Sequence, residues 1–191
     1  MKRITFAAAI AVFTLLSSVS CGKKELPAEQ QLVIGMIENV SSGIKNISFT
    51  SFEQVDSTTV IKELERRQAL FRSKVKIEGR YVKNYEEKRM MNNAAKHRKS
   101  LEQAEAILAD LEEYGKSLES CRDSIVYRTF CFSCTGTHTD GSSFHCDEMF
   151  VNILPDGTAC NLTSDRNYHT GMGRTLPGYT AILEKHRFSE E

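Results

Sequence analysis

The sequence predicts an α+β fold in which a long antiparallel helix pair packs on a small antiparallel β-meander. Residues 60–118 space their apolar side chains three and four positions apart, as the buried stripe of an amphipathic helix does. After Cys121 the pattern changes to short runs rich in β-branched and aromatic residues, separated by two Asp-Gly turns. Helices followed by consecutive strands are typical of this fold class.

The first half of the domain is expected to begin with a strand over Asn46–Val55, where apolar and polar residues roughly alternate. Asp56 or Ser57 can then cap a helix, because each offers a side-chain oxygen to the free backbone N–H groups of a first turn. The helical pattern continues to Asn92-Asn93, a pair that is expected to break it.

The second helix has the most regular pattern in the chain, an apolar stripe that extends over more than three heptads. Two long helices joined by a short break favour an internal antiparallel hairpin. The alternative is a coiled coil that binds a partner protein. The stripe comprises Ala94, His97, Leu101, Ala104, Leu108, Leu111, Gly115 and Leu118.

The β-meander is expected to contain strands over 125–135, 145–154 and 158–163. Three-residue loops at 139–141 and 155–157 would place a glycine in the left-handed conformation. This register sets Cys134 opposite Cys146, Phe130 opposite Phe150, and Phe150 opposite Leu162. The face predicted to pack on the helices comprises Phe130, Phe132, Phe150 and Leu162.

The first twenty residues have the features of a secretory leader. Lys2 and Arg3 precede an apolar run over 4–16, which is shorter than the roughly 20 residues that a membrane-spanning helix needs. Cys21 stands where a lipobox cysteine is acylated, with chains such as palmitate, and becomes the new N-terminus. Ser18 departs from that pattern, which usually has leucine there. The alternative is ordinary cleavage before an unmodified Cys21.

The predicted organisation is a signal peptide over 1–20, a lipid-anchored tether over 21–45 and a single α+β domain over 46–191. A short helix over 30–40 is an alternative within the tether. Several acyl chains hold a protein on a membrane far more firmly than one. Gly22, in place of an aspartate that would favour inner-membrane retention, favours a cell-envelope location at the outer membrane, on either its periplasmic or its surface face.

The charge balance restricts the classes of partner. Without the leader, the chain has 23 basic and 25 acidic residues, a formal net charge of −2. Such a balance creates no overall field that would attract nucleic acid or an anionic membrane surface. The expected partners are therefore the membrane, through the N-terminal lipid, and another protein of the envelope.

The lipobox-like leader, the segment Ser51–Ser57 before a charged helix and the ending Gly173–Tyr179 resemble envelope lipoproteins of Bacteroidetes that have no assigned activity. This resemblance is loose but covers most of the mature chain. It implies an envelope location and an α+β domain, and it carries no catalytic residues. Ser57 and Ser124, each preceded by aspartate, also match the short O-glycosylation pattern of that group.

One group of residues has ligand-forming side chains within a short segment: Cys131, Cys134, His138, His145 and Cys146. Thiolates and imidazoles are the ligands that zinc prefers, in sets of four. In a regular strand, however, Cys131 and Cys134 point to opposite faces, which weakens a zinc site. A Cys134–Cys146 disulfide across the hairpin follows from the predicted register, and buried free thiols are an equal alternative.

The sequence contains no Ser-hydrolase, zinc-protease, phosphate-loop or dinucleotide-binding motif. We therefore expect a non-enzymatic binding or scaffolding lipoprotein, although a catalytic site assembled from distant residues would leave no motif. The alternative is a metal- or thiol-handling protein that uses the cluster over 131–146. The charged residues Glu63, Glu65, Arg66 and Arg67 are expected to form a solvated helix face. His169 has no partner visible in the sequence.

Overall fold

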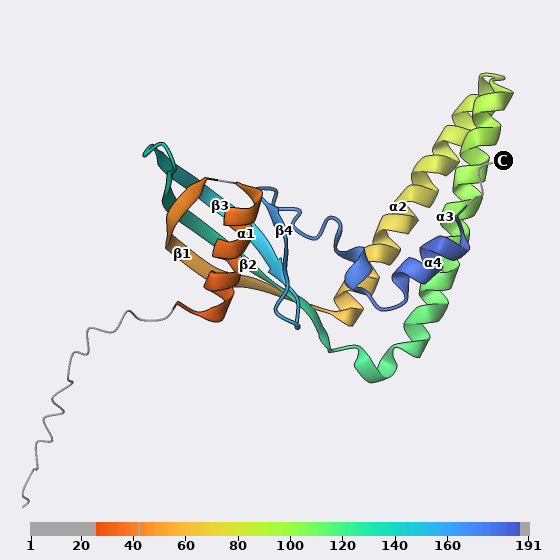
Figure 1. The fold of residues 1–191 in the computed structure, drawn as a ribbon. Coiled ribbons are helices and arrows are strands. Elements are labelled where there is room, and N and C mark those ends of the chain that lie inside the picture. The colour runs from red at the N-terminus through yellow and green to blue at the C-terminus, as the bar shows by residue number, and fades with distance from the viewer. Residues whose placement is uncertain (1–25, 42, 188–191) are drawn as a thin grey trace, which may run out of the picture.

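The computed structural model describes residues 26–41 and 43–187. It confirms the α+β class, because one antiparallel sheet with the order β1-β2-β3-β4 accompanies a long helix hairpin (Figure 1). The elements are α1 (Ala28–Val40), β1 (Ile44–Thr59), α2 (Val60–Glu87), α3 (Met91–Ser117), η1 (Glu119–Cys121), β2 (Ile125–His138), β3 (Ser143–Ile153), β4 (Ala159–Thr163), η2 (Met172–Thr175) and α4 (Tyr179–Lys185).

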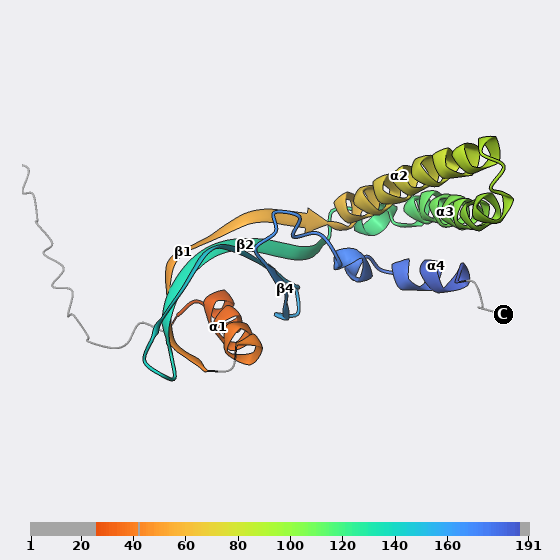
Figure 2. The ribbon, with the colours of Figure 1, turned by 90° about the horizontal axis from the view of Figure 1, so that it is seen from above.

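Helix α1 is part of the folded domain. The sheet curves around it, so that α1 lies on the concave face (Figure 2). Val33 and Ile37 point into the core that α1 forms with the sheet, and Val33 has no exposed surface. The prediction of a tether over 21–45 is therefore wrong for Ala28–Val40, because buried side chains one turn apart hold this segment on the sheet. The predicted leader over 1–20 and Cys21 lie outside the described residues.

Strand β1 is long and irregular. Its pairing with β2 shifts by one extra β1 residue between Lys45 and Ser48, between Phe49 and Ser51, and again after Gln54. Each extra residue is a β-bulge, which reverses the side-chain alternation beyond it. The bulge after Phe49 explains why Phe49 and Phe52, three residues apart, both pack in the core beneath the sheet.

Both predicted hairpin loops are confirmed. Gly141 and Gly157 have positive φ, and the amide of His138 donates to the carbonyl oxygen of Ser142 across the first loop. Cys134 lies opposite Cys146, as predicted from the loop register.

The register prediction is wrong further along β3, where Phe130 pairs with Val151. The cause is a bulge at Glu148, which has a φ of 48° and adds one residue to β3 opposite Ser133. Phe150 consequently turns to the other face of the sheet and stacks on Tyr168. A second bulge at Asn161, with a φ of 55°, moves Leu162 out of its predicted pairing with Phe150. Phe130, Phe132 and Leu162 keep the predicted face, which packs on α1.

Helices α2 and α3 form the predicted internal antiparallel hairpin, but the turn lies earlier than Asn92-Asn93. The amide of Arg89 donates to the carbonyl of Glu86, and that of Met90 donates to the carbonyl of Tyr85. With Arg89 at a φ of 55°, these bonds form a Schellman motif, which usually has glycine at this position. Asn92 and Asn93 instead occupy the first turn of α3.

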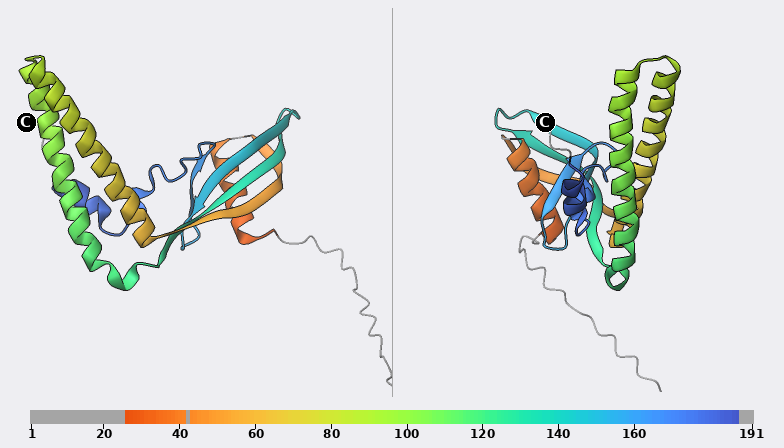
Figure 3. Two further views of the ribbon diagram at one scale, coloured as in Figure 1. Left: turned by 180° about the vertical axis from the view of Figure 1, so that it is seen from behind. Right: turned by 90° about the vertical axis from the view of Figure 1, so that its right-hand side faces the viewer.

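The hairpin contacts the sheet at its base and extends away from it at the other end (Figures 1 and 3). At the base, Val60 and Leu64 share a buried cluster with Val126 and Tyr127 of β2. The C-terminal segment completes this cluster from the other side. The residues that it contributes are Met172, Leu176, Tyr179, Ile182 and Leu183. The fold thus has two cores, one under the sheet and one at the junction between the sheet and the hairpin.

Candidate functional site

The structure separates most of the cysteine and histidine residues that the sequence groups together. Cys134 and Cys146 face the core around α1, whereas Cys131 lies on the opposite face of β2. His138 packs edge-on against Phe144, and His145 forms an ion pair with Asp147 at 2.9 Å. Within residues 26–41 and 43–187, no three Cys, His, Asp or Glu side chains are arranged to hold a metal ion.

The part of this cluster that does come together is the Cys134–Cys146 pair. Both residues are free cysteines, and their sulfur atoms lie 2.9 Å apart. Burial and the neighbouring Cys146 thiol raise the pKa of Cys134, so that this thiol stays protonated near neutral pH. Burial also raises the pKa of Cys131, with a further contribution from Glu148 and Glu53. Neither thiol has the lowered pKa of a reactive nucleophile.

A buried polar cluster, which the sequence does not predict, lies at the base of the hairpin. Glu63 has no exposed surface, although it was expected on a solvated face. Arg67 donates through Nε to Glu63 Oε1 at 2.7 Å, and the hydroxyl of Tyr127 donates to Glu63 Oε2 at 3.0 Å. A buried carboxylate needs such partners, because desolvation without them is expensive. The polar cluster comprises Asp56, Thr58, Glu63, Arg66, Arg67, Tyr127 and His169.

Arg66 links α2 to both neighbouring strands. Its Nη1 donates to the hydroxyls of Thr58 in β1 and Tyr127 in β2, each at 2.9 Å. Its Nη2 donates to Asp56 Oδ2 at 3.2 Å. Although burial opposes the change, the Ser57 amide and Arg66 hold the pKa of Asp56 below its usual value. Asp56 therefore stays ionised and fixes the guanidinium between the strands.

His169, which has no partner visible in the sequence, brings the C-terminal segment into the same cluster. Its Nδ1 lies 3.0 Å from the hydroxyl oxygen of Tyr127. Because Glu63 accepts the phenolic proton, we assign a neutral imidazole that donates its Nδ1 proton to Tyr127. Burial and the nearby Arg66 lower the pKa of His169 to about 4, which agrees with this assignment. Arg67 also donates to the carbonyl oxygen of His169, at 3.1 Å.

The polar cluster is built to hold elements together. Glu63 and Tyr127 have no exposed surface, so no substrate atom can touch them in this conformation. The hydrogen bonds instead join β1, α2, β2 and the C-terminal segment at one point, which fixes the direction of the hairpin relative to the sheet. The sequence did contain a signal, since Arg67 falls within the apolar spacing of Val60, Leu64 and Phe71.

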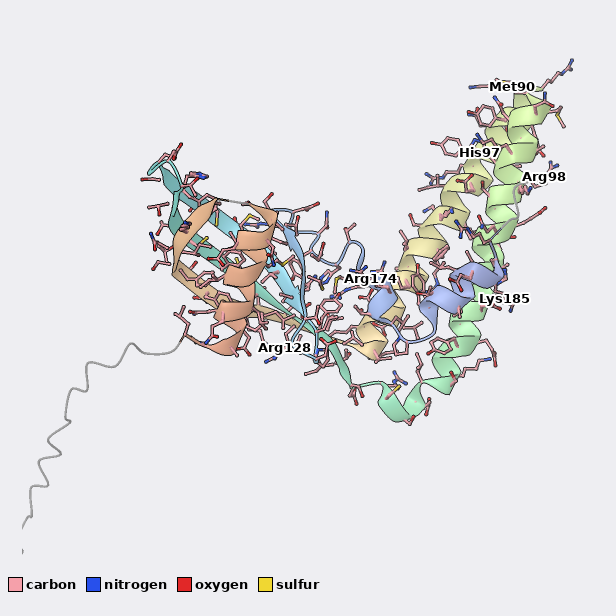
Figure 4. The ribbon with its side chains drawn as sticks, in the orientation of Figure 1. Met90, His97, Arg98, Arg128, Arg174 and Lys185 are labelled. Carbon is pink, nitrogen blue, oxygen red and sulfur yellow. The ribbon has the colours of Figure 1, made fainter. Side chains whose placement is uncertain are left out.

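A second polar contact braces the hairpin further out. His97 Nδ1 of α3 lies 2.7 Å from Glu78 Oε2 of α2, and the imidazole ring packs against Tyr81 and Tyr85. Arg98 also pairs with Glu86 across the helices. Figure 4 shows His97 and Arg98 on the distal half of the hairpin, below Met90 at its tip. Contacts between α2 and α3 therefore continue well beyond the junction core.

The distal hairpin exposes apolar side chains in an ordered arrangement. Leu70, Ile77 and Tyr81 lie seven and four residues apart, so that they share one flank of α2. Their exposed fractions are 53%, 46% and 44%. Met90 and Met91, at the tip, are exposed by 45% and 58%. These five exposed residues, called the distal face below, are the strongest candidate for a functional site.

The predicted glycosylation sites lie close to the junction. Ser124 is exposed in the loop before β2, where its carbonyl oxygen accepts the Val60 amide. Ser57 is half-buried within β1, and its amide donates to the Asp56 carboxylate at 2.8 Å. Ser124 is the more accessible of the two hydroxyls.

Comparisons with known proteins leave the chain without an assigned relative. No protein-family model matches it, and no curated protein or solved structure is significantly similar to it. Among the described residues, no helix has the length and apolar character needed to cross a membrane.

Proposed function

We propose that this protein is a membrane-anchored lipoprotein of the cell envelope whose helix hairpin acts as a non-enzymatic binding arm. The observation that carries the proposal is the distal face on a hairpin braced at its base by the polar cluster. The distal face gathers five exposed apolar side chains on one hairpin, and larger exposed apolar areas are typical of interaction sites. A rigid arm also binds with less loss of conformational entropy than a flexible segment does.

The proposed anchor is lipid on Cys21, and the predicted leader and lipobox support it. Only six residues separate Cys21 from the start of α1 at Ala28. They span at most about 20 Å when extended. This short connection would hold the sheet and α1 near the membrane. Gly22 favours the outer membrane, on either its periplasmic or its surface face.

Photocross-linking in the native envelope tests the binding arm. A photoreactive amino acid replaces Ile77 on the distal face, and Val55 on β1 serves as a matched control because it is 48% exposed. We expect Ile77 to give a reproducible adduct that Val55 does not. If the two positions give the same adducts, the binding-arm proposal is wrong. If neither gives an adduct, it is wrong unless the chain binds anionic lipid vesicles. Metabolic labelling with palmitate, lost in Cys21→Ser, tests the anchor separately.

A second candidate is a thiol-dependent role of the Cys134–Cys146 pair, favoured by its 2.9 Å separation. Two thiols alone are a poor zinc site, since structural zinc takes four ligands. The pair is better suited to a reversible disulfide that closes the β2–β3 hairpin. If Cys134→Ser and Cys146→Ser leave metal content, thiol reactivity and cell phenotype unchanged, this candidate is excluded.

A further inference from the structure

The near-zero charge of the whole chain conceals a strong separation of charge along the hairpin. Residues 72–99, the distal half, contain ten lysines and arginines and three glutamates, a formal excess of seven positive charges. Residues 101–123, which lead back to the sheet, contain seven acidic and two basic residues. Each half has a local field that the net charge of the chain does not reveal.

The three glutamates of the distal half are already engaged. Glu78 pairs with His97, and Glu86 pairs with Arg98. Glu87 lies 4.0 Å from Lys83. These pairs, together with the Arg72–Glu112 pair, leave part of the positive charge without an acidic partner. Within residues 26–41 and 43–187, the exposed side chains of Lys76, Arg80, Lys88, Arg89 and Lys96 have no ion-pair partner.

The tip combines this charge with exposed apolar side chains. Met90 and Met91 follow directly after Lys88 and Arg89, so that two exposed thioether side chains and two cations are adjacent in sequence at the end of the arm. Tyr81 adds an amphipathic aromatic ring on the flank of α2. Cations around apolar side chains are the arrangement by which peripheral proteins bind anionic lipid, with the cations at headgroup phosphates and the apolar groups among the upper acyl chains.

We propose that the tip of the hairpin, centred on Lys88, Arg89, Met90 and Met91, docks on a phospholipid leaflet that carries anionic headgroups. This inference rests on the proposed binding arm and names what the arm binds. An acidic protein would account for the cations but not for two exposed methionines at the extreme end. The tip lies at the opposite end of the molecule from α1, the first element of the described chain (Figures 1 and 2). It is therefore a second contact, separate from the anchor.

The test uses the chain from Gly22 onward, which lacks the leader and Cys21 but keeps every described residue. Its binding is measured by co-sedimentation with vesicles of phosphatidylglycerol and phosphatidylcholine in equal parts, and with vesicles of phosphatidylcholine alone. We expect binding to the anionic vesicles only. Binding should weaken as NaCl is raised from about 0.1 M to about 1 M, because the Debye length shortens from about 10 to about 3 Å.

The main variant is Lys88→Gln with Arg89→Gly, which removes two charges from the tip. Glycine suits the positive φ of Arg89, so the Schellman turn is kept or strengthened. Each cation near an anionic surface contributes a factor of about five in affinity, so the variant should bind roughly 25-fold more weakly. Lys116→Gln with Arg122→Gln, the same change of charge at the exposed base, should bind as the wild type does.

A single tryptophan reports whether the tip enters the lipid, because the chain contains none of its own. Met91→Trp should show a blue-shifted emission on anionic vesicles, and Val55→Trp should show none. The inference is overturned if the wild type does not bind anionic vesicles, if both charge variants weaken equally, or if Met91→Trp shows no shift.

Other occupants of the tip have distinct outcomes. A photocross-link at Ile77 to one protein, without vesicle binding, overturns the lipid inference but leaves the binding arm intact. Another outcome is a dimer in sedimentation velocity that dissociates in salt and does not form in the Lys88→Gln and Arg89→Gly variant. That result identifies a second copy of the chain as the occupant and overturns the lipid inference. Failure of both the cross-link and the vesicle assay removes the arm and the inference together.

Discussion

Replacing Glu63 with leucine tests whether the polar cluster holds the hairpin in place. Glu63 is fully buried and accepts from Arg67 and Tyr127. Removal of one partner from a buried ion pair costs about 3–5 kcal/mol, because the remaining charge stays desolvated. The apolar leucine recovers about 1 kcal/mol of this by burial. We expect the free energy of unfolding to fall by roughly 3 kcal/mol, with a Tm lowered by about 6–12 °C.

Urea unfolding followed by circular dichroism at the helical minimum measures this loss, with an unchanged m-value as the sign that the native state remains compact. Glu112→Leu is the matched control, since Glu112 forms an exposed pair with Arg72 at 2.9 Å. It should change the free energy of unfolding by less than about 1 kcal/mol. Replacing Glu63 and Arg67 together by leucine should recover most of the loss, because no unpaired charge remains. A Glu63→Leu variant as stable as its control would refute the reasoning.

Three further predictions concern other parts of the fold. Burial lowers the pKa of His169 from its ordinary value of 6.5 to about 4, so that the unfolded chain takes up the proton first as pH falls. Stability should therefore fall by roughly 2–3 kcal/mol as pH is lowered from about 6.5 to about 4. His169→Gln should make the free energy of unfolding less dependent on pH over this range. A variant with the same pH dependence as the wild type would contradict the prediction. Gly79→Ala should raise the free energy of unfolding by about 0.5–1 kcal/mol, since nothing lies within 4 Å of the added methyl group; a loss in thermal melts would disprove it. Diamide should accept two electrons and two protons from Cys134 and Cys146, and the disulfide should stabilise the protein by about 2–3 kcal/mol. If oxidation consumes two thiols and the free energy of unfolding does not rise, this prediction is wrong.

Local patterns predicted the elements of the fold well. The spacing of apolar residues located the helix hairpin, and the Asp140-Gly141 turn placed Cys134 opposite Cys146. These features depend on residues close in sequence, where periodicity and turn chemistry act directly. The bulge at Glu148 was not predicted, because a residue other than glycine takes the left-handed conformation there. One such residue is enough to turn Phe150 to the other face of the sheet.

The candidate site was predicted less well, because it depends on contacts between distant segments. Glu63 has the charge and spacing of a solvated helical residue, and only Tyr127, 64 residues later, explains its burial. The basic tip was concealed for a different reason, since the acidic residues after Leu101 cancel its charge in the whole-chain sum. Charge counted along each half of the hairpin would have revealed it.

The bulges of β1 affect how this edge of the sheet can pair with a strand of a neighbouring molecule. β1 is the long outer strand of the sheet, and its second edge has no neighbouring strand in the described chain. A straight edge of this length could pair with the same edge of an adjacent molecule. The extra residues near Asn46, Phe49 and Gln54 interrupt the hydrogen-bonding repeat every few positions, so that a second strand would lose register. The irregularity of β1 thus protects crowded neighbours from sheet-to-sheet aggregation.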